Sequence, residues 1–96
     1  MPVAVQKEIG FALHQVQEGM TPENSKPLMG IRSGVFEIIS DYYKNTYRAV
    51  YLVKIGNHIY VLHAFQKKSK QGIATPKQEI DLIKQRLSAA MNKNKK

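Results

Sequence analysis

Apolar residues recur at steps of three and four along the first 20 positions of the chain. The stripe consists of Val5, Ile9, Ala12, Leu13, Val16 and Met20. This spacing places its members on one face of an α-helix, and Pro2 suits the first helical position. Gly19 marks the end of the helix, because the segment that follows, 21–27, is polar and contains Pro22 and Pro27. We expect this segment to be a surface loop with room for one short turn.

The middle of the chain is rich in β-branched and aromatic residues, which predicts an antiparallel sheet. Residues 35–39 form one strand candidate, and residues 47–55 and 58–65 form two stronger ones. Gly56-Asn57 separates the last two and suits a two-residue hairpin loop, because both residues tolerate positive φ. A turn near Lys44-Asn45 is expected to precede this hairpin.

The hairpin loop sets a strand register. If the two residues that flank the loop pair with each other, Val50 lies opposite His63 and Arg48 lies opposite Phe65. Two faces result: Arg48, Val50, Leu52, Lys54, Ile59, Val61, His63 and Phe65 on one, and Tyr47, Ala49, Tyr51, Val53, Tyr60, Leu62 and Ala64 on the other. Both faces are largely apolar, so we expect a central hairpin that is covered on each side.

A basic loop, residues 66–72, follows the last strand and leads to a second helix. Thr75 at the N-cap, Pro76 at N1 and Gln78 at N3 form a capping box. The helix then carries an apolar stripe of Ile80, Ile83, Leu87, Ala90 and Met91.

These elements predict one α+β domain over residues 1–96, a length that suits a single core. It contains an N-terminal helix, a central antiparallel sheet of at least three strands and a C-terminal helix. Residues 92–96, which are basic, are expected to form a disordered tail.

The charge of the chain is large and uneven. Fifteen basic residues against seven acidic ones give a net charge of +8. Residues 1–29 hold two basic and three acidic side chains, whereas residues 30–96 hold thirteen and four. Such an excess favours a polyanion partner, because cations placed on phosphates release condensed counterions. The alternative is a solubilising surface.

Several classes of function are disfavoured by composition. Without cysteine, thiol catalysis, disulfides and thiolate metal sites are excluded. The three histidines are scattered along the chain, so we expect no metal centre. The sequence has no glycine-rich loop of the kind that binds phosphates, so we expect no cofactor. No apolar run reaches the roughly 18 residues of a membrane span, and no signal peptide is visible. We therefore expect a cytoplasmic protein without membrane contact.

A cluster of cations is the main candidate for chemistry. Arg48 begins one central strand, and Lys67, Lys68 and Lys70 follow its partner strand, so the four are expected at one end of the sheet. His63 is expected on the face of Arg48, at a diagonal distance of about 7–8 Å. Cations beside an imidazole can bind a phosphodiester and stabilise charge on its oxygens during cleavage. Nearby aromatics, among them Tyr47 and Phe65, can stack on bases.

Each of these residues also has a structural interpretation. Arg48 can pair across strands with Asp41, and His63 can be a core histidine whose hydrogen bonds are satisfied. The lysines can belong to a solvated loop. The residues alone therefore indicate a basic α+β domain directed at RNA or DNA.

Several segments together resemble the phage-derived branch of the RelE/HigB toxins. They are the strand Gly34-Val35-Phe36-Glu37-Ile38, the stretch Thr46-Tyr47-Arg48-Ala49-Val50-Tyr51, the stretch from Ile59 to Ser69 that contains Phe65-Gln66-Lys67-Lys68-Ser69, and the pairs Thr75-Pro76 and Glu79-Ile80. The similarity extends over residues 34–87, with these segments in the same order and spacing.

This resemblance implies a ribosome-dependent endoribonuclease that enters the ribosomal A site. Relatives cleave mRNA without a metal, through attack of a ribose 2′-hydroxyl on the adjacent phosphate. By position, Arg48 would lie at the scissile phosphate, and Lys67 and Lys68 would stabilise the developing charge. Arg32 and Lys70 would be peripheral contacts to mRNA or rRNA. Tyr47 would contact RNA, and His63 and Tyr47 are candidates for the general base, which is not uniform in the family.

The resemblance also implies a partner, because members of this family are the toxins of toxin–antitoxin pairs and are neutralised by a helix-turn-helix antitoxin. Two departures stand out. Relatives begin with a β-strand before the first helix, and without it we expect an uncovered sheet edge. Ile39 is apolar where relatives often carry a basic residue. The alternative function is a non-catalytic basic module that binds RNA or the antitoxin.

Overall fold

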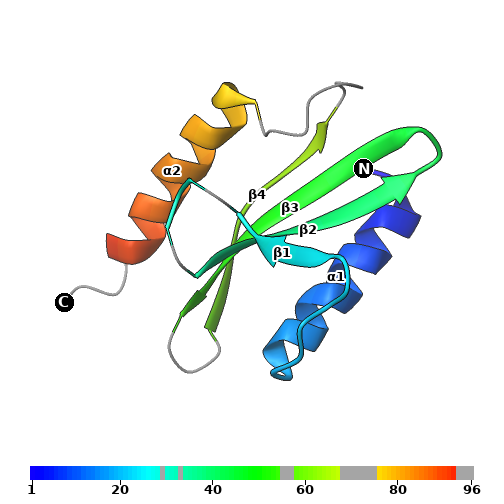
Figure 1. The fold of residues 1–96 in the computed structure, drawn as a ribbon, viewed down its shortest axis with the longest axis horizontal. Coiled ribbons are helices and arrows are strands. Elements are labelled where there is room, and N and C mark those ends of the chain that lie inside the picture. Colours follow the sequence, from blue (N-terminus) through cyan, green and yellow to red (C-terminus); the bar gives the residue numbers. More distant parts are fainter. Residues whose placement is uncertain (29, 33, 55–57, 68–75, 93–96) are drawn as a thin grey trace.

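The computed structural model describes residues 1–28, 30–32, 34–54, 58–67 and 76–92. Figure 1 shows a sheet with one helix on each of its faces. The elements in chain order are α1 (Val3–Gln17), β1 (Ser25–Pro27), β2 (Val35–Tyr42), β3 (Asn45–Lys54), β4 (His58–Lys67) and α2 (Lys77–Asn92). All neighbouring strands are antiparallel, in the order β1-β2-β3-β4. The predicted α+β arrangement of helix, antiparallel sheet and helix is confirmed.

The two faces of the sheet pack against different helices. On the α1 face, Val5, Ile9 and Ala12 of the helix meet Ile38, Tyr47, Ala49 and Tyr51 of the sheet. On the α2 face, Ile83, Leu87 and Ala90 meet an apolar set of Leu28, Val35, Val50, Leu52, Leu62 and Phe65. β3 supplies alternate residues to both cores, as expected for a strand that is covered on both sides.

Residues 25–27 correct the prediction of a loop. They form β1, with Ser25 opposite Ile38, Lys26 opposite Glu37 and Pro27 opposite Phe36. The strand therefore lies along the edge of β2 and is the first strand of the sheet. A strand of three residues is too short to show alternation, and its proline signals a loop unless it occupies a sheet edge, where no ladder donor is needed.

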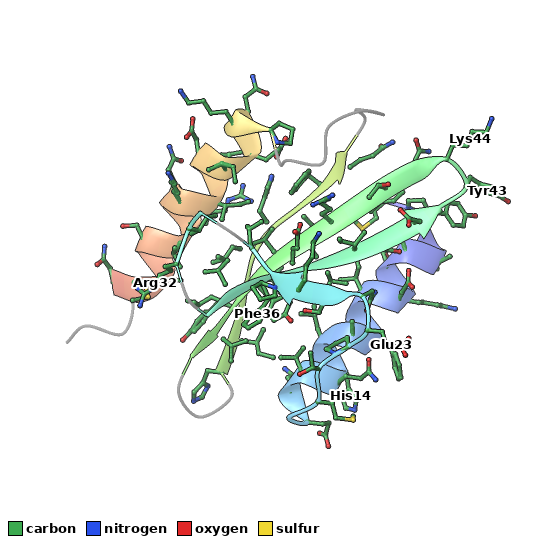
Figure 2. All side chains as sticks on the ribbon, in the orientation of Figure 1. His14, Glu23, Arg32, Phe36, Tyr43 and Lys44 are labelled. Atoms are coloured by element: carbon green, nitrogen blue, oxygen red, sulfur yellow. The ribbon has the colours of Figure 1, made fainter. Side chains whose placement is uncertain are left out.

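The β2–β3 turn lies one residue earlier than predicted. Tyr42 pairs with Asn45, so Tyr43 and Lys44 form the turn. Tyr43 has a φ of 58°, a left-handed conformation that non-glycine residues adopt uncommonly. Side-chain type therefore did not reveal the position. Figure 2 shows both turn residues at the end of the hairpin.

A β-bulge divides the β3–β4 ladder into two registers. Arg48 pairs with Phe65 and Val50 pairs with His63, as predicted. Beyond Val50 the register shifts by one residue, so Leu52 rather than Val53 pairs with Tyr60. The shift moves two side chains, Tyr60 and Leu62, to the α2 face and turns Ile59 to the α1 face. The predicted faces were therefore wrong between the bulge and the loop, because an unpaired extra residue reverses the alternation beyond it.

Helix α2 begins directly after Pro76, whose carbonyl accepts a hydrogen bond from the amide of Ile80 at 3.0 Å. The predicted N-cap, Thr75, and the tail beyond Asn92 lie outside the described residues. In the described part of the chain, neither helix is long and apolar enough to cross a membrane.

Tyr51 connects the α1 core to β1 through a hydrogen bond of 2.6 Å between its hydroxyl and Ser25 Oγ. Burial raises the pKa of the Tyr51 phenol, and the Ser25 hydrogen bond offsets part of that rise. The folded protein therefore favours the neutral phenol more strongly than the unfolded chain does.

Tyr51→Phe is expected to flatten the alkaline side of the stability profile. The neutral phenol stabilises the fold below the unfolded pKa of about 10, and this contribution is lost as the pH rises through the higher folded pKa. At neutral pH the variant should lose about 1 kcal/mol with the Ser25 hydrogen bond. Urea unfolding across the alkaline range measures both effects. An equally steep alkaline loss in the variant would contradict the assignment.

Candidate functional site

Charged and aromatic side chains from four strands share the α2 face of the sheet. Lys26 on β1 lies opposite Glu37 on β2, Arg48 follows on β3, and His63 and Phe65 lie on β4. We call these five residues the polar row. Two hollows lie on the other side of the molecule, against α1 and residues 19–24, and no lysine or arginine lines either of them. The polar row is therefore the better candidate for a phosphate site.

Arg48 is held in a buried ion pair. Its Nη1 lies 2.7 Å from Glu37 Oε1, and only 8% of its side chain and 5% of the Glu37 side chain are exposed. The other carboxylate oxygen, Oε2, lies 4.0 Å from Nζ of Lys26, whose side chain is 53% exposed. Glu37 thus lies between two cations, one buried and one at the surface.

The Arg48–Asp41 pairing considered from the sequence does not form. Arg48 lies directly opposite Ile39 and reaches diagonally to Glu37, which is one pleat further along β2. Asp41 instead accepts a hydrogen bond of 2.8 Å from Thr46 Oγ1. The register decides the partner, because the choice depended on a turn that lies one residue earlier than predicted.

The Arg48 guanidinium is only partly satisfied. Its Nε is buried and is the one side-chain polar atom of this kind without a hydrogen-bond partner in the described part of the chain. Buried donors are nearly always paired, so each exception requires an explanation. Because the guanidinium has several donors in a fixed fork, a second acceptor, such as a phosphate oxygen, would satisfy this atom.

His63 connects β4 to α2. Its ring stacks on Phe65 at a centroid distance of 5.2 Å and an interplanar angle of 20°. Arg86 Nη1 lies 2.7 Å from Nδ1 of His63 and also donates to the carbonyl of Leu62 at 3.1 Å. On the other side of the ring, Nε2 contacts Glu79 Oε1.

These contacts define the tautomer of His63. A guanidinium can only donate, so Nδ1 must accept and the ring proton must lie on Nε2, which donates to Glu79. Both ring nitrogens are therefore occupied by α2, and the imidazole serves in this structure as a connector between strand and helix. A role in proton transfer would require one of these partners to be released.

The other predicted residues are spread over the molecule. Lys67 ends β4, where its backbone pairs with Thr46, and Lys68 and Lys70 lie outside the described residues. Tyr47 is buried in the α1 core, on the face opposite Arg48. Arg32 is exposed, and its Nη1 lies 3.4 Å from Met91 Sδ. Figure 2 shows it beside the C-terminal part of α2.

Sequence reasoning missed the residues that hold Arg48 and His63. Glu37 interrupts a strand of mostly apolar residues, Val35 to Ile39, and such an interruption signals a charged residue that needs a partner if the strand is buried. Lys26 gave no such signal, because its segment was interpreted as a loop. Glu79 and Arg86 were visible only as helix residues, and their shared contact with His63 depends on how α2 lies on the sheet.

Residues 1–88 match the sequence profile of the family described as phage derived protein Gp49-like (DUF891). The chain therefore belongs to this family, which is associated with RelE-like toxins of toxin–antitoxin systems. The match is to the Gp49-like family and not to the RelE/HigB family that the sequence segments resemble. No curated protein and no solved structure matches the chain.

Glu37→Leu is expected to lower the free energy of unfolding by about 3–5 kcal/mol, because it leaves the Arg48 charge buried without its partner. Adding Arg48→Met should restore most of that loss, since an apolar pair avoids the desolvation of two ions. Urea unfolding of the wild type, both single variants and the double variant completes the cycle. A double variant as unstable as Glu37→Leu would show that the pair does not act as a unit.

The ring of His63 is expected to be the Nε2–H tautomer at neutral pH. Nitrogen-15 NMR of the imidazole measures this directly, with an unprotonated Nδ1 as the predicted result. Arg86→Gln should remove the main donor to Nδ1 and allow the two tautomers to mix, whereas Lys84→Gln, on the same helix, serves as the control. A proton on Nδ1 in the wild type would rule out the donation by Arg86.

Proposed function

We propose that this protein is the toxin of a toxin–antitoxin pair and acts as a ribosome-dependent endoribonuclease on translated mRNA. The observation that supports this function best is the buried, partly unsatisfied guanidinium of Arg48 in a strongly basic chain of a toxin-associated family. A guanidinium of this kind is suited to the planar oxygens of a phosphodiester.

The proposed reaction needs no metal. The ribose 2′-oxygen forms a bond to phosphorus while the bond from phosphorus to the 5′-oxygen breaks. The products are a 2′,3′-cyclic phosphate and a 5′-hydroxyl, and the proton lost from the 2′-hydroxyl is replaced by one gained at the leaving oxygen. Arg48 would stabilise the negative charge that accumulates on the non-bridging oxygens, and Lys67 and Lys68 would add to this field.

A general base must accept the proton that the 2′-hydroxyl loses. His63 fits the role by residue type, but it would have to exchange its contacts with Glu79 and Arg86 for the substrate. Tyr47 would have to reach across the sheet, because it lies in the α1 core. A base supplied by the ribosome or by a rearranged site is compatible with the same bond changes.

The partners follow from the same proposal. The excess of basic residues over positions 30–96 suits mRNA and rRNA, to which Arg32 and Lys70 would contribute peripheral contacts. The more acidic first third of the chain is the better surface for a helix-turn-helix antitoxin, because it does not favour a polyanion.

A second function is favoured by one specific observation. Arg48 is occupied by Glu37 and His63 is occupied on both nitrogens. A protein that binds RNA or its antitoxin without cleaving mRNA would have no need to release either side chain. We therefore retain a non-catalytic binding module as the alternative function.

Expression from a tightly controlled promoter in bacteria should arrest growth and produce mRNA cuts inside codons, mapped as new 5′ ends. The cuts should disappear when translation of the mapped transcript is blocked. Arg48→Ala is expected to reduce cutting by about 10²–10³-fold, a typical loss for one donor to a transition-state oxyanion. Lys7→Ala, on the exposed face of α1, serves as the matched control and should cut like the wild type.

The opposite outcome is equally informative. Normal growth and intact mRNA in cells that contain the folded wild-type protein would exclude the endoribonuclease. Crosslinking to RNA under the same conditions would then support the binding module.

A further inference from the structure

The polar row contains a carboxylate in the position where the proposed function requires a phosphate. Glu37 Oε1 contacts Arg48 Nη1 at 2.7 Å, and the contact uses one edge of the guanidinium while Nε has no partner in the described part of the chain. A phosphate oxygen at Nε would lie close to the Glu37 carboxylate, so two anions would share the charge of one buried cation. Phosphate binding by Arg48 is therefore weakened while Glu37 retains this contact.

Lys26 offers Glu37 a second position. Its Nζ lies 4.0 Å from Oε2, beyond a short ion-pair contact, and half of its side chain is exposed to solvent. An exposed lysine on a flexible stem can close such a distance more easily than a buried arginine can move. A shift of Glu37 toward Lys26 would pair one carboxylate with one cation and leave Arg48 with its whole fork available.

We propose that Glu37 is an internal competitor for Arg48, which a phosphate displaces onto Lys26. In the RNA-free protein, Glu37 neutralises Arg48. In the bound state, the phosphate pairs with Arg48 and Glu37 pairs with Lys26, so neither the carboxylate nor the guanidinium is left buried and uncompensated. Lys26 is thereby assigned to the phosphate site, although it lies at the sheet edge on β1.

The RNA part of this proposal rests on the proposed function, whereas the competition itself concerns any oxyanion. The apparent affinity of a site that is open for only a fraction of the time is reduced by that fraction. Weakening the Glu37–Arg48 contact should therefore tighten phosphate binding, a direction opposite to the usual effect of removing a residue from a binding site.

The test is an NMR titration with inorganic phosphate, in which the Nε–H signal of Arg48 reports binding directly. Glu37→Gln is expected to bind phosphate about tenfold tighter or more than the wild type, because the neutral amide competes less well. Lys26→Gln should bind several-fold more weakly, because the displaced carboxylate loses its second partner. Thermal melts establish that each variant is folded. If Glu37→Gln does not fold, Glu37→Asp, whose shorter side chain also weakens the contact, should show the same direction.

Two controls separate this effect from a general change in charge. Asp41→Asn removes an exposed carboxylate from the same face of β2, and Lys7→Gln removes an exposed lysine from α1. Both should bind phosphate within about twofold of the wild type, as expected for screened surface charges. An increase in Asp41→Asn equal to that in Glu37→Gln would overturn the proposal, as would unchanged or weaker binding by folded Glu37→Gln.

A short single-stranded RNA with 2′-O-methyl groups, which cannot undergo 2′-hydroxyl attack, extends the titration. If Glu37→Gln binds RNA more tightly but the wild type does not cut mRNA in cells, the endoribonuclease activity is excluded and the competition between Glu37 and phosphate is supported. If the wild type cuts mRNA but Glu37→Gln changes neither phosphate nor RNA binding, the endoribonuclease activity is supported and the competition is excluded.

Discussion

The double-sided burial of β3 is the constraint on which the rest of the structure depends. Its alternate residues belong to two separate cores, one completed by α1 and the other by α2. A strand of this kind tolerates a charge only where another buried residue compensates it. Arg48 is such a charge, and the register of β2 supplies Glu37 as its partner. The burial of Arg48 therefore depends on the strand register that places Glu37 beside it.

The β-bulge between β3 and β4 determines which β4 residues face α2. It leaves His63 and Phe65 on the α2 face and adds Leu62, the residue without a partner in the ladder, to the same face. Arg86 exploits this arrangement by binding both the carbonyl of Leu62 and the ring of His63. The imidazole thereby becomes part of the attachment of α2, which is a structural role for a residue that first suggested chemistry.

Membership of the Gp49-like family and the state of the site lead in different directions. The family is associated with toxins, and the basic charge of the chain suits RNA. Yet the two residues with the clearest catalytic potential, Arg48 and His63, are both occupied by other side chains. These facts agree if the structure represents a resting state whose arginine is released by its ligand. Competition by Glu37 would produce such a state: the Glu37 carboxylate leaves Arg48 and pairs with Lys26 when the ligand binds.

Periodicity was sufficient to predict both helices and the three long strands. These features depend on local residue preferences and on apolar residues that recur with a period of 2 or 3.6 residues, and both can be recognised in a single sequence. The predicted pairing of Arg48 with Phe65 is also observed, but it was derived from a different pairing at the loop: His58 pairs with Lys54, and the bulge compensates for this difference. The family resemblance likewise followed from short segments in a fixed order.

The partners of the site residues were decided only by the tertiary structure. β1 was too short to show a repeat, the bulge reversed the faces near the loop, and the turn at Tyr43 moved the expected partner of Arg48 from Asp41 to Glu37. The turn depends on a left-handed conformation at Tyr43 that its residue type does not signal, and the other two depend on how strands pair within the folded sheet. Residue types alone therefore identified Arg48 and His63 as candidates, whereas the contacts that now define their roles required the folded sheet and the position of α2 upon it.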